Sequence, residues 1–202
     1  MLRVEKLCCA RGPRTLFRDL SFTAAAGELV LVTGPNGSGK STLLRALAGL
    51  TRPETGKVAW DGGGQPLAHC RAYVGHAAGW KDNLSVTENL RLAWQLDGEG
   101  AAREADAASS ALERVGLARQ RNLQVVRLSQ GQRKRLHLAR LVRSTRKLWL
   151  LDEPAAALDD EGVAVLNALV GAHLAAGGLA GIATHQSLAI TAIRTRHVAL
   201  AG

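Results

Sequence analysis

The sequence has few cysteines: three in 202 residues, with Cys8 and Cys9 side by side and Cys70 on its own. Three thiols in this arrangement fit neither a disulfide framework nor a CxxC metal or redox site. We therefore interpret them as small apolar side chains in a reducing compartment. The motif CxxCH is also absent, which excludes covalent haem attachment to this chain.

A secretion signal and a membrane span are not expected either. The opening stretch MLRVEKLCCARGPRT has no long apolar core and is not expected to act as a signal peptide. Residues 162–183 carry no Asp, Glu, Lys or Arg, but Asn167, His173 and the pair Gly177–Gly178 interrupt them. Apolar residues at helical spacing favour a buried helix followed by a strand over a membrane span. The chain is expected to be soluble.

Acidic residues are scarce relative to basic ones. The chain has 26 Lys and Arg against 17 Asp and Glu, a net charge of +9, and no acid stands between Arg119 and Lys147. Such a basic stretch suits nucleic acid, an anionic lipid surface or a polyphosphate ligand, and it also suits a merely solvated surface. Charge alone leaves these interpretations open.

Strand-like and helix-like segments alternate along the chain, of which 47% is hydrophobic and 21% charged. This composition suits one globular domain, and the alternation predicts an α/β fold with a mainly parallel sheet. The stretch from about residue 80 to 145 is mostly helix-like, so we expect a helical insert there. Strands are expected at 2–7, 20–24, 27–34, 56–60, 71–75, within the apolar run 147–154, at 178–185 and near the end of the chain. Helices are expected at 40–50, at 86–118 with a break, from 130 and from about 161.

The stretch GPNGSGKST matches the phosphate-binding pattern G-x-x-x-x-G-K-[ST] between an expected strand and an expected helix. Glycines let backbone N–H groups wrap the phosphates, and the following helix adds the positive end of its dipole. Lys40 brings a point charge to the outer phosphates, and Ser41 offers a hydroxyl to Mg²⁺. The predicted nucleotide-binding residues are Gly34, Pro35, Asn36, Gly37, Ser38, Gly39, Lys40, Ser41 and Thr42.

Two further apolar strands end in chemically active residues. LWLLDE ends in Asp152, expected as a Mg²⁺ ligand, and Glu153, expected as the general base that polarises the attacking water. GIATHQ places His185 at a strand end, where an imidazole can hydrogen-bond a γ-phosphate. Taken alone, each residue also suits a solvent-facing or structural role. The phosphate loop is what favours the catalytic roles.

RLSQGQRKR, residues 127–135, resembles a second place for an anion. Ser129 and Gln132 form the capping-box pattern S-x-x-Q, which predicts a helix from about Gln130. The unpaired N–H groups of its first turn suit a phosphate, and Gly131 removes side-chain bulk there. Because the phosphate loop already holds the chain's own nucleotide, we expect this helix start to serve the nucleotide bound by another copy of the chain.

Together these motifs resemble the ATP-binding subunits of ABC transporters, in the order in which that family has them. GPNGSGKST looks like the family's Walker A, LSQGQ like its LSGGQ signature, LWLLDE like its Walker B, AALDD like its D-loop around Asp159, and His185 like its switch histidine. The resemblance implies a P-loop NTPase with an N-terminal antiparallel β part and one nucleotide-binding domain over residues 1–202. It also implies a homodimer that holds two ATP molecules, each with Mg²⁺, between the Walker A of one subunit and the signature of the other.

Two positions depart from the usual family pattern. An aromatic residue that stacks on adenine is usual ahead of Walker A, and the matching residue in LCCARG is Arg11, whose guanidinium plane can also stack on a base. A Gln that touches Mg²⁺ and faces the membrane subunit is usual after the strand expected at 71–75, and here His76 takes its place. The resemblance therefore implies base contact for Arg11 and a catalytic role for His76.

His76 and the stretches YVGHAAGWKDNLSVTENL, GLTRPETGKVAW and LDEPAAALDDEGV make the chain similar to the CcmA family, the ATPases of the haem exporter of bacterial cytochrome c maturation. This implies an enzyme that hydrolyses ATP at the cytoplasmic face of the inner membrane, with membrane subunits of the CcmB, CcmC and CcmD type. Hydrolysis is then expected to power release of a haem-loaded chaperone, with no cargo or nucleic acid bound by this chain. The same motifs also suit an ABC transporter with another cargo, or an ABC ATPase that acts on nucleic acid or ribosomes.

Overall fold

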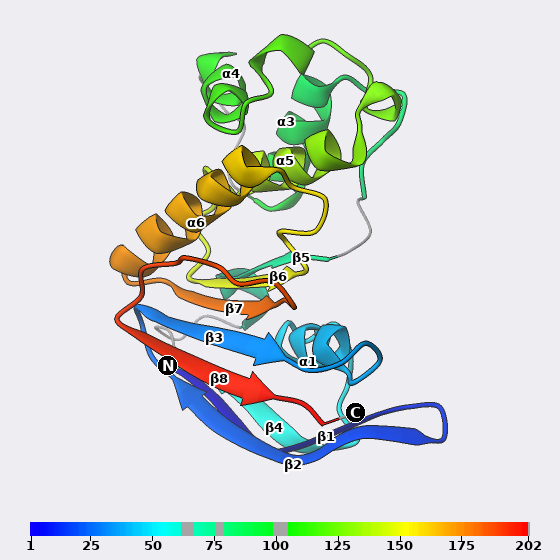
Figure 1. Cartoon of the computed structure of the whole chain (residues 1–202), viewed down its shortest axis with the longest axis vertical. Coiled ribbons are helices and arrows are strands. Elements are labelled where there is room, and N and C mark those ends of the chain that lie inside the picture. Colours follow the sequence, from blue (N-terminus) through cyan, green and yellow to red (C-terminus); the bar gives the residue numbers. More distant parts are fainter. Residues whose placement is uncertain (62–66, 76–78, 99–104, 202) are drawn as a thin grey trace. The chain divides into compact units, whose positions relative to one another are not determined.

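The computed structural model describes residues 1–61, 67–75, 79–98 and 105–201. The chain forms two compact units, of which the first carries the β-sheets and the second most of the helices (Figure 1). The first unit consists of residues 1–76, 146–154 and 170–202, and the second of residues 77–145 and 155–169.

The first unit contains a five-stranded parallel sheet in the order β5-β6-β7-β3-β8. All residues of β6 and β7 are buried, and both strands are nearly continuous apolar runs, as is typical of strands covered on both faces. Asp152 pairs with Ala183, and Ala183 pairs with Val32, so the carboxyl ends of three neighbouring strands lie in one row. The strands are β3 (Glu28–Thr33), β5 (Arg71–Val74), β6 (Leu148–Asp152), β7 (Leu179–Ala183) and β8 (Arg194–Ala199).

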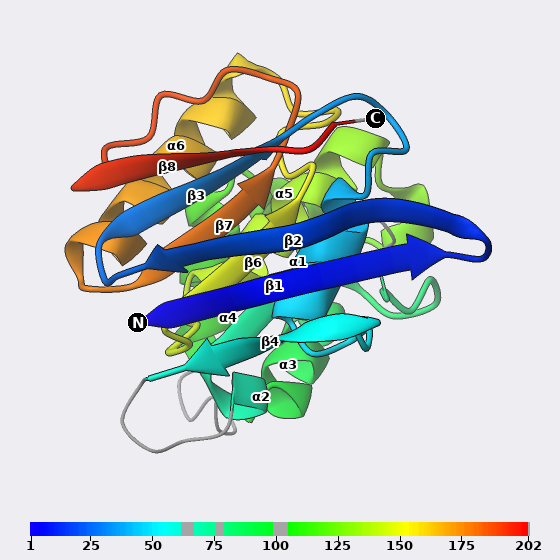
Figure 2. The same cartoon turned by 90° about the horizontal axis from the view of Figure 1, so that it is seen from below.

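A second, antiparallel sheet has the order β2-β1-β4, and Figure 2 looks onto β1 and β2. Its strands are β1 (Leu2–Arg11), β2 (Arg14–Ala24) and β4 (Thr55–Trp60). Helix α1 (Lys40–Leu47) follows β3, and the short helix α2 (Leu67–Cys70) precedes β5. Buried side chains from both sheets and from α1 form one core, among them Leu2, Val4, Phe22, Val30, Leu43, Leu44, Leu148, Leu150 and Val198.

The second unit is built from helices and short 3₁₀ turns. Helix α3 begins at a capping box, in which the Ser85 hydroxyl accepts from the Glu88 N–H and the Glu88 carboxylate accepts from the Ser85 N–H. The helices are α3 (Val86–Leu96), α4 (Ala105–Arg114), α5 (Gln130–Leu141) and α6 (Asp160–Ala175), and α6 ends in the first unit. The 3₁₀ turns are Ala118–Gln120 and Val125–Arg127.

The α/β class with a mainly parallel sheet and an antiparallel N-terminal part is confirmed. The uncharged stretch 162–183 forms α6 and β7, as expected. Strands β1 and β2 are longer than expected, because a tight turn at Gly12 and Pro13 joins them into one hairpin that pairs Arg11 with Arg14. Within the described ranges, the helices are too short or too polar to cross a bilayer.

Helix α5 buries one titratable side chain, His137, which is 6% exposed. Its ring lies 4.7 Å from that of Trp80, measured between centroids. Burial away from water, together with the positive charges of Lys134 and Arg140, lowers the pKa of His137 from 6.5 to about 3. The imidazole therefore stays neutral in the folded chain at every physiological pH.

We expect this histidine to make the chain less stable in acid. The unfolded chain takes up a proton at His137 below pH 6.5, whereas the folded chain does not until about pH 3. The free energy of unfolding therefore falls as the pH is lowered from 6.5 to 3. Between pH 6.5 and 5 this residue alone should cost about 2 kcal/mol. Urea unfolding at several pH values measures the slope. His137→Gln, which cannot titrate, should flatten it by up to one proton, and an unchanged slope would contradict the assignment.

Candidate functional site

The loop between β3 and α1 has the backbone of a phosphate cradle. Gly34, Gly37 and Gly39 have φ angles of 147°, 82° and 100°, which side chains disfavour. A Cβ on Gly34 would lie 2.5 Å from the carbonyl oxygen of Leu200, so only glycine fits there. Helix α1 begins directly after the loop, so the unpaired N–H groups of its first turn lie next to the loop.

Lys40 is held against this loop and is 7% exposed. Its Nζ donates to the carbonyl oxygens of Gly34 at 2.8 Å and Pro35 at 3.0 Å. The N–H of Ser38 donates to the carbonyl of Pro35 at 3.2 Å, which closes the turn, and Ser38 is buried. The ammonium group therefore lies beside the backbone amides that are predicted to hold the phosphates.

A cavity of about 250 Å³ opens beside the loop, and we call it the nucleotide cavity. Its wall combines the first turn of α1 with Glu153 and with two residues of the β1–β2 hairpin, Arg11 and Leu16. Arg11 stands exposed at the end of β1, so the hairpin brings it to the phosphate loop. The remaining lining residues are Asn36, Gly37, Gly39, Lys40, Ser41 and Thr42.

The carboxyl end of β6 presents the two predicted acids. Asp152 is 2% exposed, and its Oδ1 atom has no hydrogen-bond partner within the described part of the chain. Glu153 follows with a φ of 47°, a left-handed conformation that side chains rarely adopt. The carbonyl of Ala183, the last residue of β7, accepts its N–H at 2.9 Å and holds the backbone there. The strained backbone therefore places Glu153 at the nucleotide cavity.

His185 follows β7 and reaches this acid. Its Nδ1 lies 3.0 Å from the Oε2 atom of Glu153, with the histidine side chain 61% exposed and the glutamate side chain 19% exposed. The intervening Thr184 is buried, and its hydroxyl accepts from the N–H of Gln186 at 3.0 Å. The two residues predicted to act on the attacking water and the γ-phosphate are therefore in direct contact.

Tyr73 on β5 is a neighbour of Asp152, and this tyrosine was not predicted from the sequence. Burial raises the pKa of Tyr73, and the charge of Asp152 adds to this rise. The phenol therefore stays protonated beside the carboxylate. His76, predicted to act here, lies outside the described residues, two positions after the end of β5 at Val74.

The predicted capping box at the start of α5 is present. The Ser129 hydroxyl accepts from the Gln132 N–H at 3.2 Å, and the Gln132 side chain accepts from the Ser129 N–H at 3.0 Å. Gln130 is exposed, and a Cβ on Gly131 would lie 2.7 Å from the carbonyl oxygen of Ala157. The glycine thus allows the helix start to approach the chain next to Asp159.

A second cavity, of about 430 Å³, lies at this helix start, and we call it the signature cavity. It brings Ser129, Gly131 and Gln132 together with Asp159, all within the second unit. Its wall also contains Arg135, which the sequence analysis counted only as part of the basic stretch. The other lining residues are Gly116, Ala157 and Glu161.

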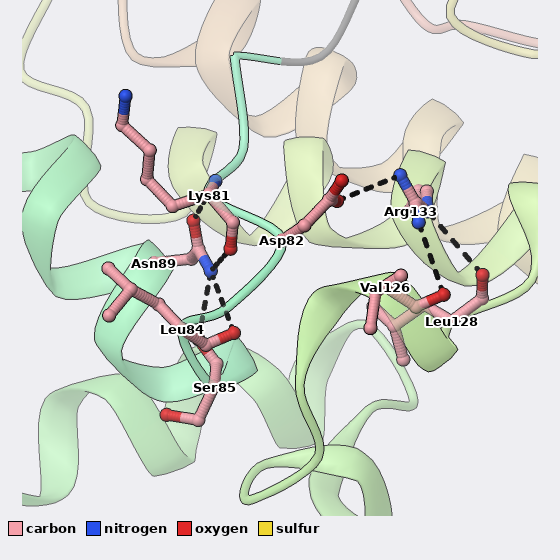
Figure 3. Close-up of polar contacts among 8 residues, drawn as sticks. All are labelled: Lys81, Asp82, Leu84, Ser85, Asn89, Val126, Leu128 and Arg133. Atoms are coloured by element: carbon pink, nitrogen blue, oxygen red, sulfur yellow. Dashed lines mark hydrogen bonds and ion pairs between the residues drawn. The ribbon is translucent and has the colours of Figure 1, made fainter.

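The segment before α3 is rigidly held by one buried amide (Figure 3). Asn89 is 2% exposed and accepts from the N–H of Lys81 at 2.7 Å. Its Nδ2 donates to the carbonyl of Lys81 at 2.9 Å and to those of Leu84 and Ser85 at 3.1 Å. This side chain therefore fixes the turn that follows the position of His76.

Arg133 connects that turn to the polypeptide in front of Ser129 (Figure 3). Its Nη1 lies 3.5 Å from the Asp82 carboxylate. Its other nitrogens donate to the carbonyls of Val126 at 3.3 Å and Leu128 at 3.4 Å. The approach to the signature is thus held by a side chain from the first turn of α5 itself.

Comparison with known sequences identifies the family. The model of the family described as "ABC transporter" matches residues 17–156. The "Cytochrome c biogenesis ATP-binding export protein CcmA" of Nitrosomonas europaea is 42% identical, over 99% of this chain and 95% of the relative. A protein called CcmA 1 from Salmonella paratyphi A is 46% identical, over 100% and 98%. The chain belongs to the ABC transporter family.

Solved structures agree with this ABC fold. A putative ABC transporter ATP-binding protein from Pyrococcus furiosus has a TM-score of 0.83, with 22% identity over 97% of this chain and 96% of that one. An ATP-binding cassette described as dimeric and bound to ADP and phosphate has a TM-score of 0.76, with 24% identity over 92% and 88%. The predictions of an ABC ATPase fold and of an ATP-hydrolysing transporter subunit are confirmed.

The residues of this ABC chain suit a magnesium ion. A buried carboxylate oxygen without a partner is costly, and Asp152 Oδ1 has none among the residues that the structure describes. A divalent cation bound there satisfies it, and the Ser41 hydroxyl at the nucleotide cavity is the second predicted ligand. When bound, the ion supplies Lewis-acid charge to the outer phosphates. Asp152 and Ser41 would hold it.

The basic stretch 119–147 is not one solvated surface. Arg140 pairs with both carboxylate oxygens of Asp97, at 2.5 and 2.6 Å. The Arg143 guanidinium lies 5.4 Å from the centre of the Trp94 ring. Arg133 and Arg135 are held by contacts inside the second unit as well. Much of this charge is therefore used within the fold, which weakens the case for a nucleic-acid surface.

We expect Glu153→Gln to bind ATP normally but to hydrolyse it about 10²–10⁴-fold more slowly, because the amide cannot act as general base. Binding is measured with a fluorescent nucleotide and turnover by phosphate release. Lys40→Ala is the matched control, since it should lose nucleotide binding itself. Near-normal hydrolysis by Glu153→Gln would move the base to another residue.

Proposed function

We propose that this chain is the ATP-hydrolysing subunit of a haem exporter that serves cytochrome c maturation. Full-length identity of 42–46% to relatives named as cytochrome c biogenesis export proteins carries this proposal. The nucleotide cavity supports it, because the phosphate loop, Glu153 and Arg11 all line it. The chain then works at the cytoplasmic face of the inner membrane, with membrane subunits of the CcmB, CcmC and CcmD type.

Each residue of the nucleotide cavity has a separate task in this proposal. The backbone of 34–39 and Lys40 bind the phosphates, and Arg11 stacks its guanidinium on the base. Glu153 accepts the proton of the attacking water, and the close contact of His185 Nδ1 with its Oε2 atom, at 3.0 Å, orients that carboxylate. His76 takes the place of the usual glutamine beside the γ-phosphate. These roles form one site for ATP hydrolysis.

The second half of the site comes from another copy of the chain. Ser129, Gly131 and Asp159 line a cavity in the second unit, whereas all residues of the nucleotide cavity belong to the first. A homodimer in which each signature closes on the partner's ATP uses both. The solved relative described as dimeric with ADP and phosphate is consistent with such an arrangement.

Mixed dimers test this exchange. Differently tagged Lys40→Ala and Ser129→Arg chains, paired, should regain hydrolysis of one ATP per dimer, because one composite site then has an intact loop and an intact signature. Both changes on one chain, paired with a wild-type chain, should leave no intact composite site. Hydrolysis by both dimers is measured as phosphate release in a single turnover. Activity in the second dimer but not in the first would show a site made within one chain.

Deleting the gene tests the cargo assignment. We expect the deletion strain to lose c-type cytochromes, seen by haem staining of gels, while b-type haem proteins remain, because only the covalent pathway needs exported haem. Complementation with Glu153→Gln should fail, and complementation with the wild-type chain should succeed. Normal c-type cytochromes in a strain without a second copy would overturn the cargo, and the ABC ATPase assignment would stand.

A further inference from the structure

The signature cavity contains a charged side chain with no role in the proposed chemistry, Arg135 of α5. Its side chain is 10% exposed, and Nη1 donates to the carbonyl of Val115 at 3.2 Å. Its Nη2 donates to the carboxylates of Asp159 at 2.5 Å and Glu161 at 3.0 Å. One guanidinium thus joins the end of α4, the D-loop and the first turn of α6.

Gly116 shows how closely this guanidinium is fitted. The glycine has a φ of 72°, and a Cβ there would lie 2.5 Å from the Nη1 atom of Arg135. Burial alone lowers the pKa of Arg135, but the hydrogen bonds to Asp159 and Glu161 outweigh it and raise the pKa. The Arg135 guanidinium is planar and permanently charged, and its acceptors lie on three elements, so only one orientation satisfies all of them. The arrangement is therefore rigid where it meets Asp159.

Asp159 is held at one of its two oxygens. Oδ1 accepts from Arg135 and also from the N–H of Gly162 at 3.0 Å. The hydrogen bond from Arg135, followed by that from Gly162, lowers the pKa of Asp159 and keeps it ionised. Its side chain nevertheless stays 67% exposed at the cavity. With one oxygen fixed, the exposed carboxylate shares the signature cavity with Ser129.

We infer that Arg135 is a positioning residue of the composite ATP site, which orients Asp159 toward the nucleotide held by the partner copy. It acts through Asp159 and does not touch the nucleotide. This inference rests on the proposed ATP sandwich. It predicts that a substitution at Arg135 slows hydrolysis of the ATP bound by the partner chain and spares hydrolysis of the ATP bound by its own chain.

A dimer of one wild-type and one Lys40→Ala chain isolates the effect, because its single working site pairs the wild-type phosphate loop with the signature of the Lys40→Ala chain. Arg135→Lys on the Lys40→Ala chain should lower kcat at least about tenfold, as expected for a misplaced reacting group. The apparent affinity for ATP should change less than twofold. The same substitution on the wild-type chain should leave turnover within twofold, because that signature faces an empty loop.

Equal losses on the two chains, or no loss on either, would overturn the inference, since general destabilisation does not depend on which chain carries the change. Ser129→Arg placed on the same two chains tests the sandwich itself. If Ser129→Arg shows the chain dependence and Arg135→Lys does not, only the role of Arg135 falls. If neither substitution shows chain dependence, the proposed ATP sandwich is wrong as well as the role of Arg135.

Two controls separate position from stability. Arg140→Lys removes an equivalent guanidinium–carboxylate pair from the same helix, at a residue that does not line the signature cavity, and should lower the melting temperature without any chain dependence. Gly116→Ala displaces Arg135 without removing it and should reproduce the chain dependence even if Arg135→Lys does not assemble. Gly177 has the same left-handed backbone (φ of 79°) but open space for a Cβ, so Gly177→Ala should show no chain dependence.

Discussion

The register of the parallel sheet is the constraint on which the nucleotide half of the site depends. Asp152 of β6 lies opposite Ala183 of β7, and Ala183 lies opposite Val32 of β3. Parallel strands in register end at one edge, and catalytic residues of open α/β sheets gather there. The phosphate loop, the acids Asp152 and Glu153, and His185 are all short extensions of these three strands. A shift of one residue would turn each side chain to the opposite face.

The signature half depends instead on side chains that donate hydrogen bonds to backbone carbonyls. Loops such as those around 81–85 and 115–128 contain many carbonyl groups that no sheet or long helix satisfies. Asn89, Arg133 and Arg135 each donate to such carbonyls. In these described loops of the second unit, amide and guanidinium side chains hold the backbone, whereas strand pairing holds the backbone of the first unit. This is also why much of the second unit's positive charge lies in internal contacts.

Local sequence patterns predicted the parts of the site that local interactions create. The phosphate loop, the capping box of Ser129 and Gln132 and the apolar strands before Asp152 and His185 depend on neighbours within a few residues. The contact of Glu153 with His185 depends on strand register, and that of Arg135 with Asp159 joins residues 24 positions apart. Neither leaves a signal in a single sequence. The length of the β1–β2 hairpin was underestimated because mixed polar and apolar residues continue its pairing.

The hairpin contributes Arg11, and no aromatic residue, to the nucleotide cavity, which affects how nucleotide binding can be measured. None of the described residues that line this cavity is aromatic, and the chain's four tryptophans all stand elsewhere. A bound purine therefore has no indole or phenol of the cavity wall to quench. Trp80 and Trp94 lie in the helical unit, one beside His137 and the other beneath Arg143. Trp60 and Trp149 lie in strands of the first unit, and neither lines the cavity, so intrinsic tryptophan emission should remain nearly silent to the base itself.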